Sequence, residues 1–305
     1  MSLFFPLTLF GQGLPGEGDE ILCVGAVQYS LSPEIYLSSE KFINTINQIL
    51  DNLEEQALTK ESPYPLDLVV FPEYTSALFG LGHLSVQARE ELFSLNQPLF
   101  QNDDVIRAIN LGSIQTQKIW ERIALEREYP ILAGSTLTID SAGRIRNQAL
   151  LFHPQKGLIW TQDKSFPGAP ETRILNLAVA SPEQATPFTI DDKRIVLTIC
   201  RDTYNTIWES IFPPAFLWID IKANELPKDL AKYPEALSAR LSHSPIPYGL
   251  TVSLIGKLAN FHFQGPLEFI SPEETLQFGD FYSTNDGSLD TWSLIVQIPK
   301  TNSLQ

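Results

Sequence analysis

The fold of this chain is decided by a short apolar segment at residues 65–73, which reads PLDLVVFPE. Its run LDLVVF has the length and apolar content of a buried β-strand. Pro72 lacks a backbone N–H and ends such a strand, which leaves Glu73 to project from its end. A similar segment, ILCVGAVQY at residues 21–29, precedes it, and residues 38–58 between the two have the periodicity of an amphipathic helix. Strand, helix and strand in succession predict α/β layers around an apolar sheet.

Further apolar and periodic segments follow along the whole chain. We expect helical segments at residues 86–94, 116–128, 205–211 and around 230–241. We expect short strands at residues 129–138, 148–152, 158–161, 194–199, 216–221, 249–254, 261–263 and 292–298. The sequence contains no internal repeat, low-complexity tract or long linker. It therefore predicts a single domain over residues 1–305, in which residues 1–20 form a loosely ordered N-terminal arm.

The charge balance excludes several classes of function. The 305 residues include 21 Lys and Arg against 36 Asp and Glu, a formal net charge of −15. An acidic protein of this kind is repelled by nucleic-acid phosphates and anionic lipid, so neither partner is expected.

No apolar run approaches the ~20 residues that a membrane-spanning helix needs. Cys23 and Cys200 are the only cysteines, which is typical of reduced thiols and predicts a cytoplasmic protein.

Several common motifs are absent or misplaced. The segment GQGLPG at residues 11–16 matches the dinucleotide-binding pattern in letters only, because it precedes the first strand and contains Pro15. The apolar N-terminus MSLFFPLTLF has no Lys or Arg before its apolar run, so a signal peptide is not expected. The four histidines are scattered without ligand spacing, and no G-x-S-x-G segment occurs. We therefore predict no metal site, and no serine nucleophile of the common hydrolase type.

Three reactive side chains stand at the ends of predicted strands. Glu73, Lys164 and Cys200 each follow or close such a strand, Cys200 in the segment VLTICRD. Loops at the carboxyl ends of strands often carry catalytic groups, because the sheet holds them rigidly. Taken one at a time, these residues are more often ordinary turn, surface and core residues. Their combination and their order along the chain indicate a catalytic site.

These residues and their surroundings resemble the nitrilase superfamily of carbon–nitrogen hydrolases. The resemblance runs from VGAVQ in the first strand through LDLVVFPE to the segment YPILAGSTLTIDSAGRIRNQALLFHPQKGLIWTQDK, which ends at Lys164. It implies a four-layer α-β-β-α sandwich, with Glu73, Lys164 and Cys200 as catalytic triad. It also implies a second catalytic glutamate, Glu171 in KSFPGAPE, a homodimer or higher homo-oligomer, and catalysis without metal or organic cofactor.

The sequence departs from the family pattern after the nucleophile. The family usually has an aromatic residue where this chain has Arg201, and the acidic residue that follows is kept as Asp202. Asp202 either takes part in the chemistry or hydrogen-bonds the adjacent loop, and we favour the loop. Arg173 and Arg201 are candidates for binding a substrate carboxylate, although arginines are as often surface residues. Cys23 lies within an apolar strand and is expected to be a buried core thiol.

The resemblance predicts an enzyme that hydrolyses a small amide, an N-carbamoyl compound or a nitrile through a thioester. In this chemistry Glu73 accepts the thiol proton, while Lys164 and the backbone N–H of Arg201 stabilise the oxyanion. An acyltransferase that passes the thioester to an amine is an alternative within the enzymes. A catalytically silent binding or scaffold protein is the alternative from another class. The apolar segments 212–221 and 230–241 are a further reason to expect a homodimer.

Overall fold

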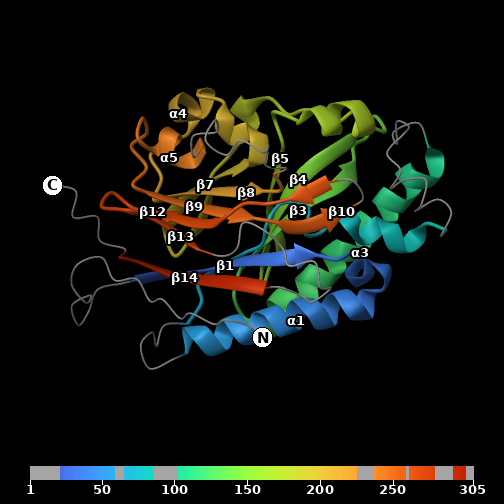
Figure 1. Ribbon diagram of the computed structural model, residues 1–305, viewed down its shortest axis with the longest axis horizontal. Helices are drawn as coiled ribbons and strands as arrows, with labels where there is room; N and C mark the ends of the chain where they lie inside the picture. The colour runs from blue at the N-terminus through green and yellow to red at the C-terminus, as the bar shows by residue number, and fades with distance from the viewer. Residues whose placement is uncertain are drawn as a thin grey trace.

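The computed structural model describes residues 21–58, 65–85, 102–224, 236–258, 261–278 and 291–299. Figure 1 shows four layers in these residues: two helices, a sheet, a second sheet and two shorter helices. The first helical layer consists of α1 (Ser39–Ala57) and α3 (Asp103–Arg127), and the last of α4 (Ile207–Ile211) and α5 (Ala236–Leu241). The predicted α-β-β-α sandwich is therefore confirmed.

The first sheet carries the segment from which the fold was predicted. Its strands follow the order β11-β10-β1-β2-β3-β4-β5, and β14 pairs with β1. β2 is parallel to its neighbours β1 and β3, whereas β3, β4 and β5 form an antiparallel meander. The bounds are β1 (Ile21–Leu31), β2 (Leu68–Val70), β3 (Ile131–Ile139), β4 (Ile145–His153), β5 (Gly157–Asp163), β10 (Ile255–Leu258), β11 (Phe261–Phe263) and β14 (Thr291–Pro299).

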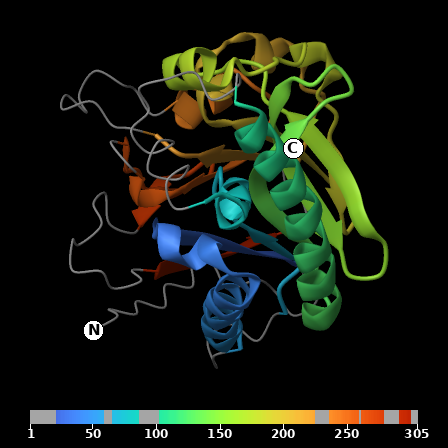
Figure 2. The ribbon, with the colours of Figure 1, turned by 90° about the vertical axis from the view of Figure 1, so that its right-hand side faces the viewer.

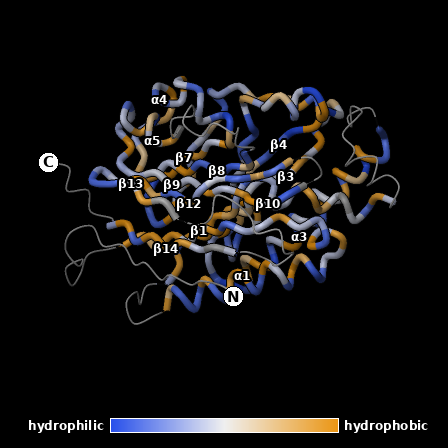
Figure 3. The backbone as a smooth tube through the Cα atoms, in the orientation of Figure 1, coloured by the Kyte–Doolittle hydropathy of each residue, from blue (hydrophilic) through white to orange (hydrophobic). Residues whose placement is uncertain are grey.

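The second sheet holds the strand that leads into Cys200. Its order is β13-β12-β9-β8-β7-β6, in which β7, β8 and β9 are parallel. The bounds are β6 (Phe188–Ile190), β7 (Lys193–Ile199), β8 (Leu217–Lys222), β9 (Tyr248–Ser253), β12 (Leu267–Ile270) and β13 (Thr275–Phe278). In the first sheet, Figure 3 shows hydrophobic colour gathered along β1 and β14, while the helix α1 that covers this sheet alternates between hydrophobic and hydrophilic positions.

Three of the four apolar clusters among the described residues hold the four layers together. The central cluster joins the facing sides of the two sheets, for example Val24 and Val70 of the first sheet with Leu197 and Ile219 of the second. Another packs α1 and α3 against the outer side of the first sheet, and Figure 2 shows α3 running along this side over β3, β4 and β5. The third cluster packs α4 and α5 on the outer side of the second sheet around Trp218. Burial on both faces explains the nearly continuous apolar runs of the strands.

Most predicted elements are confirmed, with one clear correction. α1 agrees with the predicted helix at residues 38–58. α3 begins at Asp103, thirteen residues before the predicted start at residue 116. Asn102 caps it by accepting hydrogen bonds from the N–H groups of Asp104 and Val105, and a glycine in mid-helix weakened the sequence signal. The helix predicted at residues 86–94 and the arm at residues 1–20 lie outside the described residues.

The apolar segment at residues 212–221 belongs to the core of this chain. Phe212 and Trp218 pack with α4 and α5, and Leu217 and Ile219 pack between the sheets. Of the segment 230–241, only α5 is described, and its Leu237 is also buried in the core. These side chains do not form an exposed apolar face, so the homodimer stays a prediction that rests on the family resemblance. No helix among the described residues has the length and apolar character needed to cross a membrane.

Candidate active site

The predicted catalytic residues lie at strand ends, as expected from the sequence. Glu73 follows β2, Lys164 follows β5, and Cys200 follows β7. β2 and β5 point the same way because two antiparallel steps separate β5 from β3, which is parallel to β2. Their carboxyl ends therefore share an edge of the first sheet.

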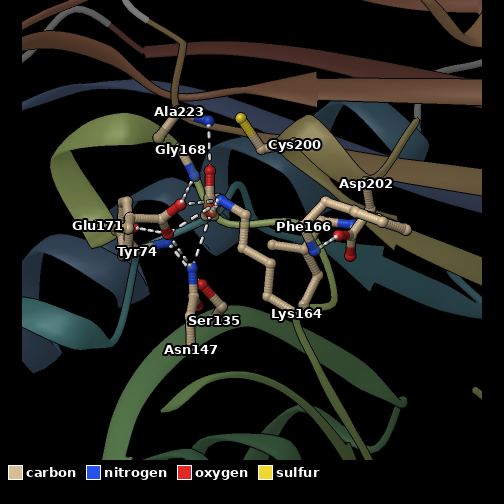
Figure 4. Close-up of polar contacts among 12 residues, drawn as sticks. Tyr74, Ser135, Asn147, Lys164, Phe166, Gly168, Glu171, Cys200, Asp202 and Ala223 are labelled. Carbon is tan, nitrogen blue, oxygen red and sulfur yellow. Dashed lines mark hydrogen bonds and ion pairs between the residues drawn. The ribbon is translucent and has the colours of Figure 1, made fainter. Parts of the chain in front are cut away.

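Glu73, Lys164 and Glu171 form one buried network of charges. The Lys164 ammonium lies 2.8 Å from Glu73 Oε1 and 2.8 Å from Glu171 Oε2. Lys164 is 2% exposed and Glu73 is fully buried. Asn147 on β4 donates from Nδ2 to Oε1 of both glutamates, at 2.8 Å and 3.1 Å. One cation and one amide thus hold two buried carboxylates together, largely shielded from water (Figure 4).

Backbone donors fix the remaining carboxylate oxygens. The N–H of Ala223, directly after β8, donates to Glu73 Oε2 at 2.9 Å. The N–H of Gly168 donates to Glu171 Oε2 at 2.6 Å, and the Tyr74 hydroxyl donates to Glu171 Oε1. The segment between Lys164 and Glu171 therefore curls so that both side chains meet. This geometry brings together the second glutamate and the lysine that the resemblance paired.

The two glutamates differ in their readiness to bind a proton. Burial raises the pKa of Glu73 to about 7, and the nearby Lys164 offsets this only in part. Burial also opposes ionisation of Glu171, but Lys164 and the hydrogen bonds that Glu171 accepts outweigh it, so its pKa is lowered. Burial works against the Lys164 charge as well, yet the surrounding carboxylates raise its pKa far above the usual value. Glu171 is thus a permanent anion beside a permanent cation, and Glu73 is suited to proton transfer near neutral pH.

Cys200 stands at a sharp turn directly after β7. Its φ is 54°, in the left-handed region that non-glycine residues rarely adopt, and it opens the short helix η6 (Cys200–Tyr204). Its side chain points toward the charged network in Figure 4, and its thiol donates to Asn224 Oδ1 at 2.9 Å. Burial raises the pKa of Cys200, and Glu73 raises it further. The resting thiol is therefore protonated and needs a base to become a nucleophile.

The residues around Cys200 clarify the role of Asp202. Its Oδ1 accepts from the N–H groups of Ser165 at 3.0 Å and Phe166 at 2.6 Å, and its Oδ2 accepts from Ile199 at 3.3 Å. Asp202 does hydrogen-bond loop backbone, but the loop is the one that directly follows Lys164 and not the adjacent loop that the sequence suggested. Burial raises the pKa of Asp202 to about 7, against the effect of Lys164 and the backbone donors. Asp202 joins the turn that carries Cys200 to the loop that follows Lys164.

Asp202→Ala is expected to lower the free energy of unfolding by about 3 kcal/mol, because buried N–H groups lose their acceptor. Glu273→Ala removes an exposed carboxylate in a turn and is the control, with a change within about 0.5 kcal/mol. Urea denaturation of the three proteins measures both values. An Asp202→Ala protein as stable as the control would show that these hydrogen bonds do not join the two loops.

The structure adds residues that the sequence did not suggest. Asn147 has a weak sequence signal, because an asparagine is unusual inside an apolar strand. Tyr74 follows Glu73 directly, with a φ of 62°, and Asn224 gives no local signal. Arg173 and Arg201 are exposed, and their role in binding a substrate carboxylate stays a prediction.

Comparison with known proteins agrees with this fold. No protein-family model and no curated protein sequence matches the chain. Solved structures of an amidase from Nesterenkonia sp. AN1 do match. A double mutant in complex with acrylamide has a TM-score of 0.66 and 14% identity, over 95% of this chain and 94% of that one.

Two further structures of that amidase give the same picture. A mutant with the acetamide moiety of fluoroacetamide bound covalently at the active-site cysteine has a TM-score of 0.65 and 15% identity, over 94% of both chains. Another mutant, described as an amidase from the nitrilase superfamily, has the same TM-score, identity and coverage. At the level of the fold, the resemblance to the nitrilase superfamily is confirmed.

Proposed function

We propose that this protein is a cysteine-dependent hydrolase that cleaves the carbon–nitrogen bond of a small amide, N-carbamoyl compound or nitrile. The observation that carries the proposal is the buried network of Glu73, Lys164 and Glu171 beside the turn of Cys200. A poised base, a fixed cation and a thiol at a strained turn are the groups that acyl transfer needs. The covalent cysteine adduct and the acrylamide complex of the Nesterenkonia amidase support an amide substrate.

The first half of the reaction forms a thioester. Glu73 in its ionised form takes the proton from Cys200 as the sulfur bonds to the amide carbon. The carbonyl π electrons move to oxygen, where the Lys164 ammonium and the backbone N–H of Arg201 stabilise the negative charge. The carbon–oxygen double bond then re-forms and the carbon–nitrogen bond breaks. Protonated Glu73 returns its proton to the departing nitrogen, which leaves as ammonia or an amine.

The second half releases the acid. Glu73 removes a proton from water as the water oxygen bonds to the thioester carbon. The carbon–sulfur bond breaks, and the sulfur takes the proton back from Glu73, which restores the resting site. Glu171 keeps its negative charge throughout and holds Lys164 in place between the carboxylates. An amine in place of water gives the acyltransferase alternative with the same residues.

The pH profile follows from Glu73. Below pH 7 this carboxyl is largely protonated and cannot accept the thiol proton, so kcat/KM is expected to rise as the pH passes through about 7. Asn147→Leu removes a hydrogen bond that favours the ionised form of Glu73. The rising limb in this variant is therefore expected at a higher pH than in the wild type. A limb that stays in place, or moves to lower pH, would show that another group controls the profile.

Ammonia release tests the proposed function directly. Purified protein is incubated with a panel of small amides, ureido acids and nitriles, with Cys200→Ala as the matched inactive variant. We expect turnover of at least one class that is absent from Cys200→Ala. A panel of ordinary amines added to the active reactions separates the alternatives, because an acyltransferase passes the acyl group to an amine in preference to water. No turnover in the whole panel, with Cys200 as unreactive as Cys23, would favour the scaffold alternative.

The single domain, the homodimer and a cytoplasmic location stay predictions from the sequence.

A further inference from the structure

A second buried ion pair lies beside Cys200, on the neighbouring strand β8. The Lys222 ammonium lies 2.9 Å from Asp220 Oδ2, and these side chains are 9% and 0% exposed. β7 and β8 are parallel, with Thr198 opposite Asp220 and Ile199 opposite Ile221. One step further in the same register, Cys200 directly follows β7 and Lys222 is the last residue of β8. The proposed reaction uses neither member of this pair.

The pair contacts the turn that carries the nucleophile. The hydroxyls of Thr198, before Cys200, and Thr203, after it, lie beside Asp220 and offset part of the rise that burial causes in its pKa. Those two hydroxyls also bond each other at 2.7 Å. The Lys222 ammonium lies 5.9 Å from the ring centroid of Tyr204, which ends η6. The pair therefore lies against the end of η6, next to the strand that leads into Cys200.

The residues after the pair hold two catalytic groups. The N–H of Ala223 bonds Glu73, and the side chain of Asn224 accepts from the Cys200 thiol. A buried ion pair is weak evidence for a stabilising role, because desolvation opposes the attraction of the charges. Its position at the end of β8, on the strand next to the one that leads into Cys200, favours a role in the site instead.

We propose that Asp220 and Lys222 are positioning residues that set the reactivity of Cys200 through opposite charges. Lys222 favours the thiolate that forms when the thiol loses its proton. Asp220 disfavours that thiolate and keeps Lys222 beside the turn. The pair adds no net charge to the site. Its effect on Cys200 therefore depends on how far the Lys222 charge and the Asp220 charge each lie from the sulfur. This inference concerns the thiol alone and holds whichever carbon–nitrogen substrate the protein takes.

Other charged and titratable groups also face Cys200. Glu73 and Tyr74 come from the loop after β2, Lys164 from the loop after β5 and Glu171 from η4 (Glu171–Leu175). Burial raises the pKa of Cys200 most, Glu73 raises it next, Lys164 lowers it, and both Glu171 and Asp220 raise it. Burial opposes the charge of Lys222, but Asp220 and Cys200 are among the groups that raise its pKa. The coupling between strand β8 and the thiol therefore acts in both directions.

Alkylation of Cys200 as a function of pH tests the inference without any amide turnover. Iodoacetamide is applied to the native protein, and peptide mass mapping follows Cys200 separately from Cys23. Lys222→Met is expected to move the midpoint of the rate up by about one pH unit, and Asp220→Asn is expected to move it down by about as much. At a fixed pH below the midpoint, these shifts correspond to rates about tenfold lower and about tenfold higher than in the wild type. The double variant, which has neither charge, is expected near the wild-type midpoint.

Two controls change the net charge equally at exposed sites. Lys156→Met lies before β5, at the opposite end of that strand from Lys164, and Asp192→Asn lies before β7, at the opposite end from Cys200. Both are expected to leave the midpoint unchanged. Circular dichroism confirms that each variant is folded. If Lys222→Met does not fold, the downward shift in Asp220→Asn and its reversal in the double variant decide the question.

Opposite shifts in the two single variants support the inference, because a merely structural pair would slow or speed alkylation at every pH without moving the midpoint. Shifts in the same direction, or unchanged midpoints, would overturn it. Failure of the proposed function has a different signature, which is normal charge-dependent alkylation of Cys200 without ammonia release from any substrate.

Discussion

Glu73→Gln is expected to lower kcat for amide hydrolysis by about 10²–10⁴-fold, the range that a positioned general base contributes. The thiol of Cys200 is protonated at rest, because burial and Glu73 both raise its pKa. A glutamine in place of Glu73 has the same shape but cannot take the proton, so both thioester formation and its hydrolysis slow. The amide oxygen still accepts a hydrogen bond in the buried network, so the variant is expected to fold.

The effect of Glu73→Gln is measured as the single-turnover rate of product formation, which separates the chemical step from substrate binding. Glu40→Gln, an exposed position in α1, is the matched control and is expected to retain the wild-type rate. Substrate binding, measured by calorimetry with Cys200→Ala in the background, is expected to change little. A single-turnover rate within about threefold of the wild type, well outside the expected range, would remove Glu73 from the mechanism.

Lys164→Met is expected to slow turnover strongly and also to destabilise the protein by about 3–5 kcal/mol, the effect of breaking a buried ion pair. Lys164 is the cation that faces both glutamates. Without it the oxyanion loses a donor, which lowers kcat by about 10²–10³-fold. Two buried carboxylates also lose the charge that favours their ionised forms, so the pKa values of both rise in the folded variant.

The loss of stability in Lys164→Met is expected to depend on pH. A carboxyl with a raised pKa in the folded state binds protons more tightly there than in the unfolded chain. Its folded form is therefore favoured at low pH and loses stability as the pH rises. The gap in melting temperature between variant and wild type is expected to be smaller at about pH 5 than at about pH 8. Lys156→Met, at an exposed position, is the control, and its melting temperature is expected to equal that of the wild type at both pH values. A difference in melting temperature for Lys164→Met that widens on acidification would contradict the buried network.

The sequence predicted the framework of the fold because burial leaves strong local signals. The segments 21–29 and 65–71 are apolar on both faces, and they became neighbouring parallel strands of one sheet. The start of α3 and the strands β6, β10, β12 and β13 were not predicted. Each of these strands has at most four residues, and so short a run carries too few positions for a period to stand out.

The candidate site likewise contains residues that the sequence predicted and residues that it did not. Glu73, Lys164 and Cys200 were predicted because each stands at a strand end and because their order resembles that of a known family. Asn147 and Asn224 were not predicted, because their contacts depend on strand register and on which loops meet at one edge. The pair Asp220 and Lys222 looks like ordinary alternation on a strand with one polar face. Only the pairing of β8 beside β7 brings these charges next to Cys200.

Covalent trapping with fluoroacetamide tests most directly the central claim that Cys200 is the nucleophile. The sulfur displaces fluoride from the halogenated carbon, so a carbon–sulfur bond forms and fluoride is released. We predict one acetamide adduct per chain, on the peptide that contains Cys200, with Cys23 unmodified, and amidase activity falling in step with labelling. An adduct on Cys23, or full activity after complete labelling of Cys200, would contradict the account.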